Sequence, residues 1–386
     1  MPHQNTVFRQ LTKMIPWAML ERLVGEHGAD SRVRRLTTYG QLQAMMFGQL
    51  SGARSLRDIE ALLDSHDARR YHAGLPKVKR STLADANANR PAEVFSGLFA
   101  AMVGSQRRKL RRCVGETVNL IDSTGIRLNR LSAHWSRFSA EVCGVKAHVI
   151  YDADGGLPVY VATTPARVND ITAAKQMPIE AGATYVFDLG YYDYAWWAKL
   201  DGAGCRIVTR LKSNTPLRVT ERRPVAKESN ILSDRIGRLP VRLAASRNNP
   251  MAKLVREIRV RISTGTVLRI VSNDLEMPAG EIAALYKRRW GIELFFKWVK
   301  QTLKIRHFYG TSENAVRIQI AVALICFLLI KLAHAQQTAV SQLTSFARLI
   351  SGNLMHRKPI GRLRRSGPEP DVVAVQTTDQ GTFLWA

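Results

Sequence analysis

Apolar residues recur at a helical spacing from the N-terminus to about residue 110 of the chain. From Tyr39 to Leu50 they fall three and four positions apart, which is typical of a helix that buries one face. Ser55 is placed to cap a helix through LRDIEALL, and Ser81 or Thr82 to cap another through LADANANR. The pattern therefore predicts an all-helical N-terminal region.

At Thr117 the pattern changes to short apolar or alternating segments, which is typical of strands. Three of these follow in order, TVNLID, GVKAHVIY and LPVYVAT, and the turn DADGG predicts that the second and third form a hairpin. A short helix, capped by Asn169 or Asp170 and ending near Pro178, leads to the strand TYVFD. The aromatic helix YYDYAWWAKL then leads to the strand CRIVTRLK. The predicted order β-β-β-α-β-α-β indicates an α/β fold, a mixed sheet with flanking helices.

Residues 213 to about 279 are rich in Arg, Val and Thr and alternate in REIRVRIS and TVLRIVS, so they predict a β-rich insertion. Helical spacing then returns from about Ala279 to about Ala335. Within it, the run IQIAVALICFLLI (318–330) is uncharged but only 13 residues long. Because a membrane-spanning helix needs about 20 apolar residues, we expect a helix buried in the core and no membrane partner.

These changes of pattern divide the chain into five predicted parts. A basic helical domain precedes an α/β core that the β-rich insertion interrupts, and the chain ends in a loosely held basic tail. The predicted boundaries are 1–112 for the helical domain, 113–212 and 280–345 for the two parts of the core, 213–279 for the insertion and 346–386 for the tail.

The charge of the chain points to a polyanionic partner. Lys and Arg number 57 against 31 Asp and Glu, for a formal net charge of +26. Such an excess indicates nucleic acid more often than an anionic membrane surface. The basic residues are spread along the chain, which favours an extended contact surface over a single tail. A solvated basic surface without a specific partner stays open, as does a helical N-terminal region that only covers the main domain instead of binding DNA.

The cysteines indicate a reducing compartment. Cys113, Cys143, Cys205 and Cys326 form no Cys-x-x-Cys pair, so neither a zinc site nor a disulfide framework is suggested. We expect them to be reduced and buried. The segment MPHQNTVFRQ lacks the apolar run of a secretory signal. The predicted location is the cytoplasm.

The segment YKRRWGIELFFKWVK carries the strongest local signal. Treated as one helix at about 100° per residue, it places polar and aromatic groups on a single stripe and apolar groups on the other side. The stripe comprises Tyr286, Arg289, Trp290, Glu293, Lys297 and Lys300, and the apolar side comprises Ile292, Phe295, Phe296 and Val299. A surface salt-bridge ladder through Arg289, Glu293 and Lys297 is the alternative interpretation of this segment.

Two further acids favour a functional role for that helix over the salt-bridge ladder. Asp122 and Asp188 each end a predicted strand, where side chains project from a sheet edge into a cleft. Together with Glu293 they form the carboxylate set that a two-metal phosphoryl-transfer site requires. Without metal, three clustered carboxylates would repel each other and take up protons.

These residues resemble a known family. Tyr286, Arg289, Glu293 and Lys300 match the Y-x2-R-x3-E-x6-K pattern of the insertion sequence 4 family of DDE transposases, and the strand order looks like the ribonuclease H-like fold. NLIDSTG and FDLGYYDY look like the first and second acidic motifs of that family. The resemblance covers residues 115 to 335. The chain departs from the family pattern at two positions. Many members have Arg where this chain has Leu189, and some have His where it has Phe296.

The resemblance implies roles for these residues. Asp122, Asp188 and Glu293 would be catalytic and bind two Mg²⁺ or Mn²⁺ ions. Tyr286, Arg289 and Lys300 would contact phosphates near the cut DNA end. Trp290 would stack on an unpaired base or belong to the core. Further DNA contacts are proposed for Lys297, also on the stripe, and, more weakly, for Arg210 and Lys212 after the fifth strand, where a solvated strand end is the alternative.

The same resemblance implies cut-and-paste transposition by a bacterial, nucleoid-associated protein. Its partners would be double-stranded DNA at terminal inverted repeats, target DNA, and a second copy of the chain in a homodimer. Two alternatives stay open, a catalytically inactive DNA-binding protein derived from a transposase and a ribonuclease H-like nuclease without strand transfer.

Other conspicuous side chains are expected to be structural. Trp196 and Trp197 are expected in the core, and His148 within a strand. Asp152 and Asp154 are expected to serve the turn of the hairpin, because Asp-Gly is turn chemistry. Asp170 is expected to cap a helix, as stated above, and not to bind metal.

Overall fold

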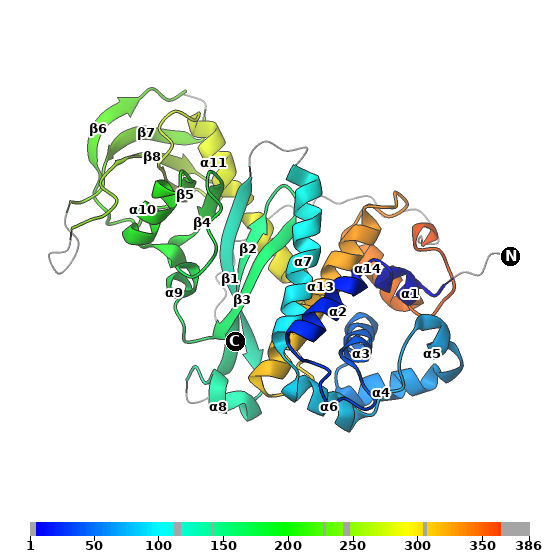
Figure 1. Cartoon of the computed structure of the whole chain (residues 1–386). Coiled ribbons are helices and arrows are strands. Elements are labelled where there is room, and N and C mark those ends of the chain that lie inside the picture. The colour runs from blue at the N-terminus through cyan, green and yellow to red at the C-terminus, as the bar shows by residue number, and fades with distance from the viewer. Residues whose placement is uncertain are drawn as a thin grey trace.

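The computed structural model describes residues 5–111, 117–139, 142–226, 229–241, 248–303 and 307–363. Figure 1 shows the N-terminal helices gathered at one end of the molecule and strands β6 to β8 at the other. Strands β1 to β3 and helix α7 lie between these two ends (Figure 1). Cys113 and most of the predicted basic tail fall outside the described residues.

The N-terminal region is helical, as predicted. Ser55 caps α4, since its hydroxyl accepts a hydrogen bond from the Asp58 backbone N–H at 3.1 Å. The predicted cap at Ser81 or Thr82 is wrong, because α6 is already helical at Arg80 and both residues lie inside its first turn. The helices are α1 (Val7–Thr12), α2 (Trp17–Glu26), α3 (Thr38–Ser51), α4 (Leu56–Ser65), α5 (Asp67–Ala73), α6 (Arg80–Asn89) and α7 (Ala92–Arg111).

One sheet of nine strands runs through the rest of the molecule, in the order β3-β2-β1-β4-β5-β9-β8-β7-β6. β1, β4 and β5 are parallel, and the other pairings are antiparallel. The strands are β1 (Val118–Leu128), β2 (Cys143–Asp152), β3 (Leu157–Pro165), β4 (Thr184–Phe187), β5 (Arg206–Arg210), β6 (Arg218–Arg223), β7 (Ile231–Arg238), β8 (Leu254–Arg261) and β9 (Val267–Ser272).

The first five strands confirm the predicted order and the ribonuclease H-like mixed α/β fold. The β2–β3 hairpin forms, and Asp152 Oδ1 accepts hydrogen bonds from the backbone N–H groups of Asp154 and Gly155, as expected for this turn. The helices between the later strands are α9 (Asp170–Ala174) and α10 (Tyr194–Gly202), and short helical segments follow β1 at η1 (Arg130–Ser132) and α8 (Ala133–Ser136). α9 ends earlier than predicted, four residues before Pro178.

The β-rich insertion is not a separate sheet. β9 pairs with β5 in antiparallel fashion, through Val208 opposite Ser272, and β8, β7 and β6 extend the sheet from there. The strands of the α/β core and of the insertion therefore belong to one hydrogen-bonded sheet.

The chain returns to helix at Ala279, as predicted, but in three pieces. The segment predicted as one helix from Tyr286 to Lys300 is broken at Arg289, where a turn separates α11 from α12. The physical reason is a local tightening, because the Arg289 N–H bonds the Tyr286 carbonyl three residues back instead of four. The helices are α11 (Ala279–Arg288), α12 (Trp290–Thr302) and α13 (Glu313–His334).

Helix α13 is the core helix predicted from the run at 318–330. It is long and apolar enough to cross a membrane, yet 83% of its most apolar window is buried inside the protein. It packs against α7 and α3, so apolar residues all around it are covered. Helix α14 (Leu343–Asn353) also packs on α13 and crosses the predicted boundary at residue 345. The predicted domain boundaries remain a prediction.

Two buried clusters cover the two faces of the sheet. Alternate residues of a strand point to opposite faces, and β1 contributes Leu120 to one cluster and Ile121 to the other. The first cluster joins α11 to α13 and the N-terminal helices, and the second joins α9 and α10. Trp196 and Trp197 lie in the second cluster, as expected. Cys143, Cys205 and Cys326 are free and buried, as expected.

Candidate active site

The two aspartates of the predicted site are neighbours in the parallel pair of strands β1 and β4. Ile121 lies opposite Phe187 in that register, so the next residue on each strand is an aspartate, Asp122 and Asp188. Asp188 follows the last residue of β4, as predicted. Asp122 does not end its strand, because β1 continues along β2 as far as Leu128. It lies instead where the pairing with β4 stops.

Helix α12 brings the third acid to the same place. Arg289, in the turn before α12, contacts Glu293 Oε1 at 2.6 Å and Asp122 Oδ2 at 3.7 Å. The Arg289 side chain is only 18% exposed, which makes it a mostly buried bridge between two acids. The salt-bridge ladder considered for this segment therefore exists in part, but it is directed at the sheet and includes Asp122.

The electrostatics of Asp122 show that the acids are close. Burial, with the nearby Asp188 and Glu293, raises the pKa of this carboxyl from 3.8 to about 7, while the Ser123 N–H and Arg289 act against that rise. The Ser123 backbone N–H donates to Asp122 Oδ1 at 2.8 Å. A buried acid with two acidic neighbours is the condition in which a cation is most strongly stabilised.

Tyr286 and Arg210 complete the wall of this site. Burial raises the pKa of the Tyr286 hydroxyl, and the positive charges of Arg289 and Arg210 oppose that rise, so both guanidinium groups lie near the phenol. The Arg289 guanidinium carbon lies 5.8 Å from the centre of the Tyr286 ring. The Nε of Arg210 is buried and has no hydrogen-bond partner. Arg210 is thus not the fully solvated strand end that the sequence left open.

The remaining residues of the predicted stripe differ in exposure. Trp290 is 41% exposed, so the indole is not part of the core. Lys297 is exposed and Lys300 is half-buried on α12. Lys212 is exposed and lies over the Tyr192 ring, with Nζ at 4.7 Å from its centre. Tyr286 is buried, whereas Trp290 and Lys297 are accessible.

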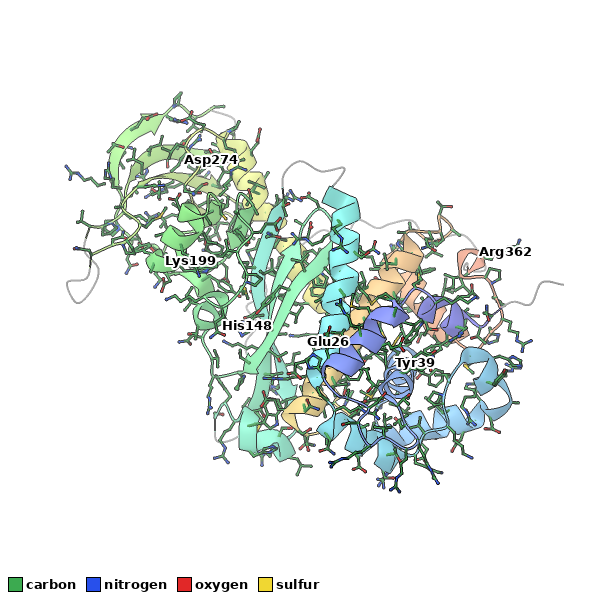
Figure 2. All side chains as sticks on the ribbon, viewed as in Figure 1. Glu26, Tyr39, His148, Lys199, Asp274 and Arg362 are labelled. Atoms are coloured by element: carbon green, nitrogen blue, oxygen red, sulfur yellow. The ribbon has the colours of Figure 1, made fainter. Side chains whose placement is uncertain are left out.

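A polar network that the sequence did not indicate lies behind the aspartates. Asp170 Oδ1 accepts a hydrogen bond from the Ser123 hydroxyl at 2.8 Å and contacts Lys146 Nζ at 3.2 Å. His148 Nδ1 lies 3.7 Å from the same oxygen, and Figure 2 labels His148 among the strands. The cap predicted for Asp170 is wrong, because its carboxylate bonds these side chains instead of the helix N-terminus. Alternation along β2 would have placed Lys146 and His148 on one face, but only the fold brings Ser123 and Asp170 to them.

The donor set fits a hard divalent cation, although the site is not assembled for one. Within the described ranges, no group of three or more His, Cys, Asp or Glu side chains is arranged so that it could hold a metal ion. Arg289 occupies the space between Asp122 and Glu293. Carboxylate oxygens are the ligands that Mg²⁺ prefers, and burial, followed by the charge of Asp188, raises the pKa of Asp122, which a bound cation would oppose.

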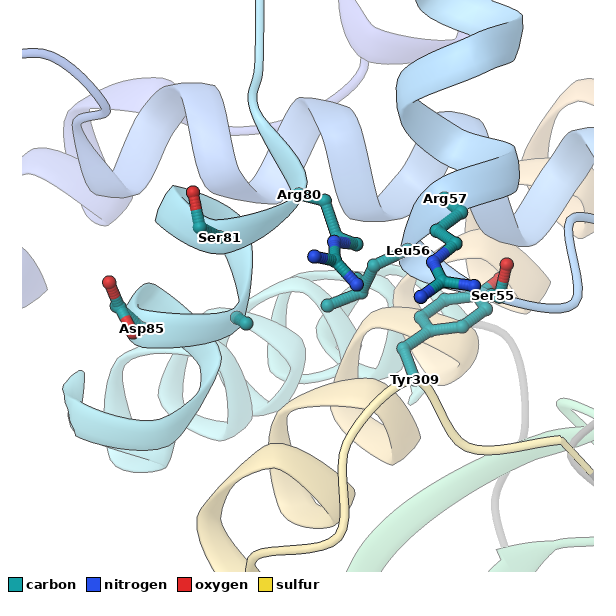
Figure 3. Close-up of a pocket in the computed structure, with 8 residues that line it drawn as sticks. Ser55, Leu56, Arg57, Arg80, Ser81, Asp85 and Tyr309 are labelled. Atoms are coloured by element: carbon teal, nitrogen blue, oxygen red, sulfur yellow. The ribbon is translucent and has the colours of Figure 1, made fainter.

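A groove lies on the N-terminal helices. It has a volume of about 550 Å³ and lies between the start of α4, the start of α6 and Tyr309. Figure 3 shows Arg57 and Arg80 on either side of it, with Tyr309 below Arg57. The three acids of the candidate site are not among its lining residues.

Comparison with known proteins identifies relatives. The family described as "Transposase DDE domain" matches residues 114–329, and a "Domain of unknown function (DUF4372)" matches residues 3–76. A Sinorhizobium fredii protein named as the transposase y4zB is 38% identical over 286 residues, covering 74% of this chain and 80% of that protein. A Geobacillus stearothermophilus protein named as a transposase for insertion sequence element IS5377 is 29% identical over 290 residues, covering 73% and 75%. The structure of a piggyBac transposase synaptic complex with hairpin DNA is 12% identical, with a TM-score of 0.46, covering 89% of this chain and 79% of that one.

Proposed function

Since the chain belongs to the DDE-domain transposases and is a DNA transposase, we propose that it excises an insertion element by cutting at the element ends and joins the freed 3′-hydroxyl to target DNA. The observation that carries this proposal is the meeting of three acids from distant parts of the chain. Asp122 from β1 lies next to Asp188 across the pairing of β1 with β4, and Arg289 bridges Asp122 to Glu293 from α12.

We assign the role of metal ligands to Asp122, Asp188 and Glu293. Two Mg²⁺ or Mn²⁺ ions, when bound, would supply activation of the attacking oxygen and stabilisation of the leaving oxygen. The chain itself holds the acids on a rigid frame, because Asp122 and Asp188 sit on paired strands and Glu293 on a helix packed against β1. Arg289 pairs with Asp122 and Glu293, so it would compete with a cation for these two carboxylates.

The phosphates of the cut end would then contact the cations of the same wall. Arg289, once released from Glu293, carries donors that match a phosphate in a two-pronged geometry. Arg210 has a buried Nε without a partner, and Tyr286 offers its hydroxyl beside both arginines. Lys297 and Lys300 follow on α12, Lys212 follows β5, and the exposed Trp290 indole would stack on an unpaired base.

The partners we propose are terminal inverted repeats, target DNA and a second copy of the chain, in the cytoplasm at the nucleoid. In such a homodimer each copy of the chain would hold one end of the element, which brings the two ends together. The groove lined by Arg57 and Arg80 supports a DNA contact by the N-terminal helices, because two exposed guanidinium groups flank it. The formal net charge of +26 supports a DNA-bound assembly in which the surface charge of each copy is neutralised.

The experiment uses a donor plasmid in which the DNA flanking the gene brackets a marker, together with a target plasmid and purified protein in Mg²⁺. We expect an excised linear marker and then its insertion into the target. Nicks or linear products without insertion would leave a nuclease that lacks strand transfer. Binding of the flanks without any cleavage would leave a DNA-binding protein derived from a transposase, and either result contradicts the proposal.

A further inference from the structure

We propose that one face of the insertion, formed by Arg222, Arg235, Glu257, Arg259, Arg261 and Arg269, binds the phosphate backbone of double-stranded DNA. This surface is called the arginine face below. The proposal rests on the proposed function, since it says where the transposase holds DNA outside the site of the three acids. None of its residues belongs to that site.

Register places these side chains together. Val255 and Val271 pack in the cluster under α10. Moving two residues at a time along β8 keeps the same face and leads from Val255 to Glu257, Arg259 and Arg261. The same step on β9 leads from Val271 to Arg269. Arg235 on β7 lies opposite Glu257, and Arg222 on β6 lies opposite Arg235, so both belong to the same face. The arginine face is thus the continuation of the sheet face that α10 covers.

A buried carboxylate organises the inner part of this face. Glu257 is fully buried and forms ion pairs with Arg235, with Arg269 at 2.5 Å and with Arg259 at 3.5 Å. Burial would raise the pKa of Glu257, but the arginines outweigh it and hold the pKa low. One negative charge therefore orients three guanidinium groups and cannot neutralise them, so a net positive charge remains at the surface.

The outer part of the face is free to meet a partner. The side chains of Arg222 and Arg261 are exposed, and in the described part of the chain neither forms a hydrogen bond or an ion pair. Arg259 is 42% exposed. Five arginines against one glutamate are far more cationic than stability of the sheet requires, since exposed charges of one sign repel each other.

The dimensions suit duplex DNA. Neighbouring strands lie about 4.8 Å apart, so the row from β6 to β9 spans about 15 Å. A DNA groove is about 6 to 12 Å wide, so side chains at the two ends of the row reach phosphates on both sides of one groove. Apart from the exposed Val267 opposite Arg261, the described residues of the face are arginines and polar groups with no aromatic platform, which favours phosphate contact without base recognition.

The test is the double variant Arg222→Ala/Arg261→Ala, with fluorescence anisotropy on a 40-base-pair duplex of random sequence between about 50 and 200 mM salt. Each lost phosphate contact makes the slope of log K against log salt shallower by about 0.9. We expect a change of about 1.8 for the pair, with an unchanged melting curve because both side chains lack partners. Arg222→Lys/Arg261→Lys keeps the charge and should keep the slope.

The matched control is Arg218→Ala/Arg238→Ala. These two exposed arginines lie opposite each other in β6 and β7, and Arg238 points to the other face because it is three residues beyond Arg235. Their removal should leave the slope unchanged. Steep wild-type binding that survives Arg222→Ala/Arg261→Ala, or an equal loss in the control, overturns the arginine face and spares the proposed function. Wild-type protein that shows no salt-dependent binding overturns both.

Discussion

Arg289 is the residue on which the state of the candidate site depends. It contacts two of the three acids and offsets part of their negative charge, and it is also a candidate phosphate ligand. An exposed salt bridge contributes little to stability, whereas this one is mostly buried and each partner would be costly to leave alone. The same residue therefore links folding, metal entry and DNA contact.

The pH dependence of stability should report the buried Asp122. Its pKa is about 7 in the folded protein against 3.8 for the free group. The folded state therefore binds more protons between these values, so metal-free stability falls as pH rises from about 4 to about 7 and stays low above that. Asp122→Asn removes the penalty, which is on the order of 4 kcal/mol at most at pH 8. Denaturant unfolding in EDTA at pH 4, 6 and 8 measures it, and a wild type that loses no stability over this range contradicts the account.

Arg289→Ala should make the metal-free protein less stable and more responsive to metal. Asp122 and Glu293 lose their counter-charge, at a cost on the order of 2 kcal/mol, and an added dication can replace it. Thermal melting with and without Mg²⁺ should show a larger metal-induced increase in melting temperature than in wild type, together with weaker binding of cut DNA ends. Gln301→Ala, a change at an exposed residue of α12 without an assigned role, is the control. An Arg289→Ala protein with wild-type DNA affinity and no added response to Mg²⁺ would show that Arg289 only forms a structural salt bridge.

The acids and the basic residues of the site could be predicted as single residues, because carboxylates beside strand ends and a specific helix motif are visible in the sequence. The partners of Asp170 could not, since Ser123, Lys146 and His148 meet it only through the pairing of β1 with β2 and the placing of α9. The burial of Arg210 Nε likewise depends on α11 packing over β5.

At the scale of elements, the strand order followed from alternation and turn residues because each of the first five strands has a clear local pattern. The break at Arg289 was not predicted, since its backbone stays in the right-handed helical region and the nearest glycine, Gly291, lies inside α12. The helical projection placed Tyr286 beside Arg289, as the structure does, but it did not indicate that Tyr286 is buried. Continuity of the sheet into the insertion depends on long-range pairing of β5 with β9, for which no local pattern exists.

A glycine in β7 tests how tightly the insertion is built. A Cβ at Gly237 would lie 2.4 Å from the Arg218 carbonyl oxygen of the neighbouring strand, next to an irregularity in the β6–β7 register. Gly237→Ala should therefore cost about 1 to 3 kcal/mol, as overpacking does, measured by chemical denaturation. Gly280→Ala is the matched control, because nothing lies within 4 Å of that position and alanine favours the helix. Equal stability of the two variants would show that β6 and β7 adjust without strain.

At the scale of the whole molecule, one sheet joins the candidate active site to the arginine face, and the groove beside Arg57 and Arg80 lies on the helices at the other end. DNA that follows these features would cross much of the protein (Figure 1). The composition alone predicted an extended contact surface. The proposed contact residues could not be located from it, because they come together only through the register of the strands.

Binding to DNA should therefore be strongly dependent on salt. At least roughly six phosphate contacts give a slope of log K against log salt steeper than about −5. Anisotropy titrations of the wild-type protein on a duplex measure this slope directly. A slope near −1 corresponds to about one phosphate contact. It would contradict an extended contact surface and leave the formal net charge of +26 unexplained by DNA binding.

The central claim is that Asp122, Asp188 and Glu293 act as one metal-binding set, and the most direct measurement is cleavage of a labelled duplex carrying an element end. Asp122→Asn, Asp188→Asn and Glu293→Gln each keep the shape of the side chain and remove the charge that a hard dication requires. Several kcal/mol of lost stabilisation, at about 1.36 kcal/mol per tenfold, correspond to at least about a thousandfold loss of cleavage rate in Mg²⁺. Binding of the end should persist in all three variants. Near-wild-type cleavage by Glu293→Gln would contradict the account, because Glu293 would then be a salt-bridge partner of Arg289 and not a metal ligand.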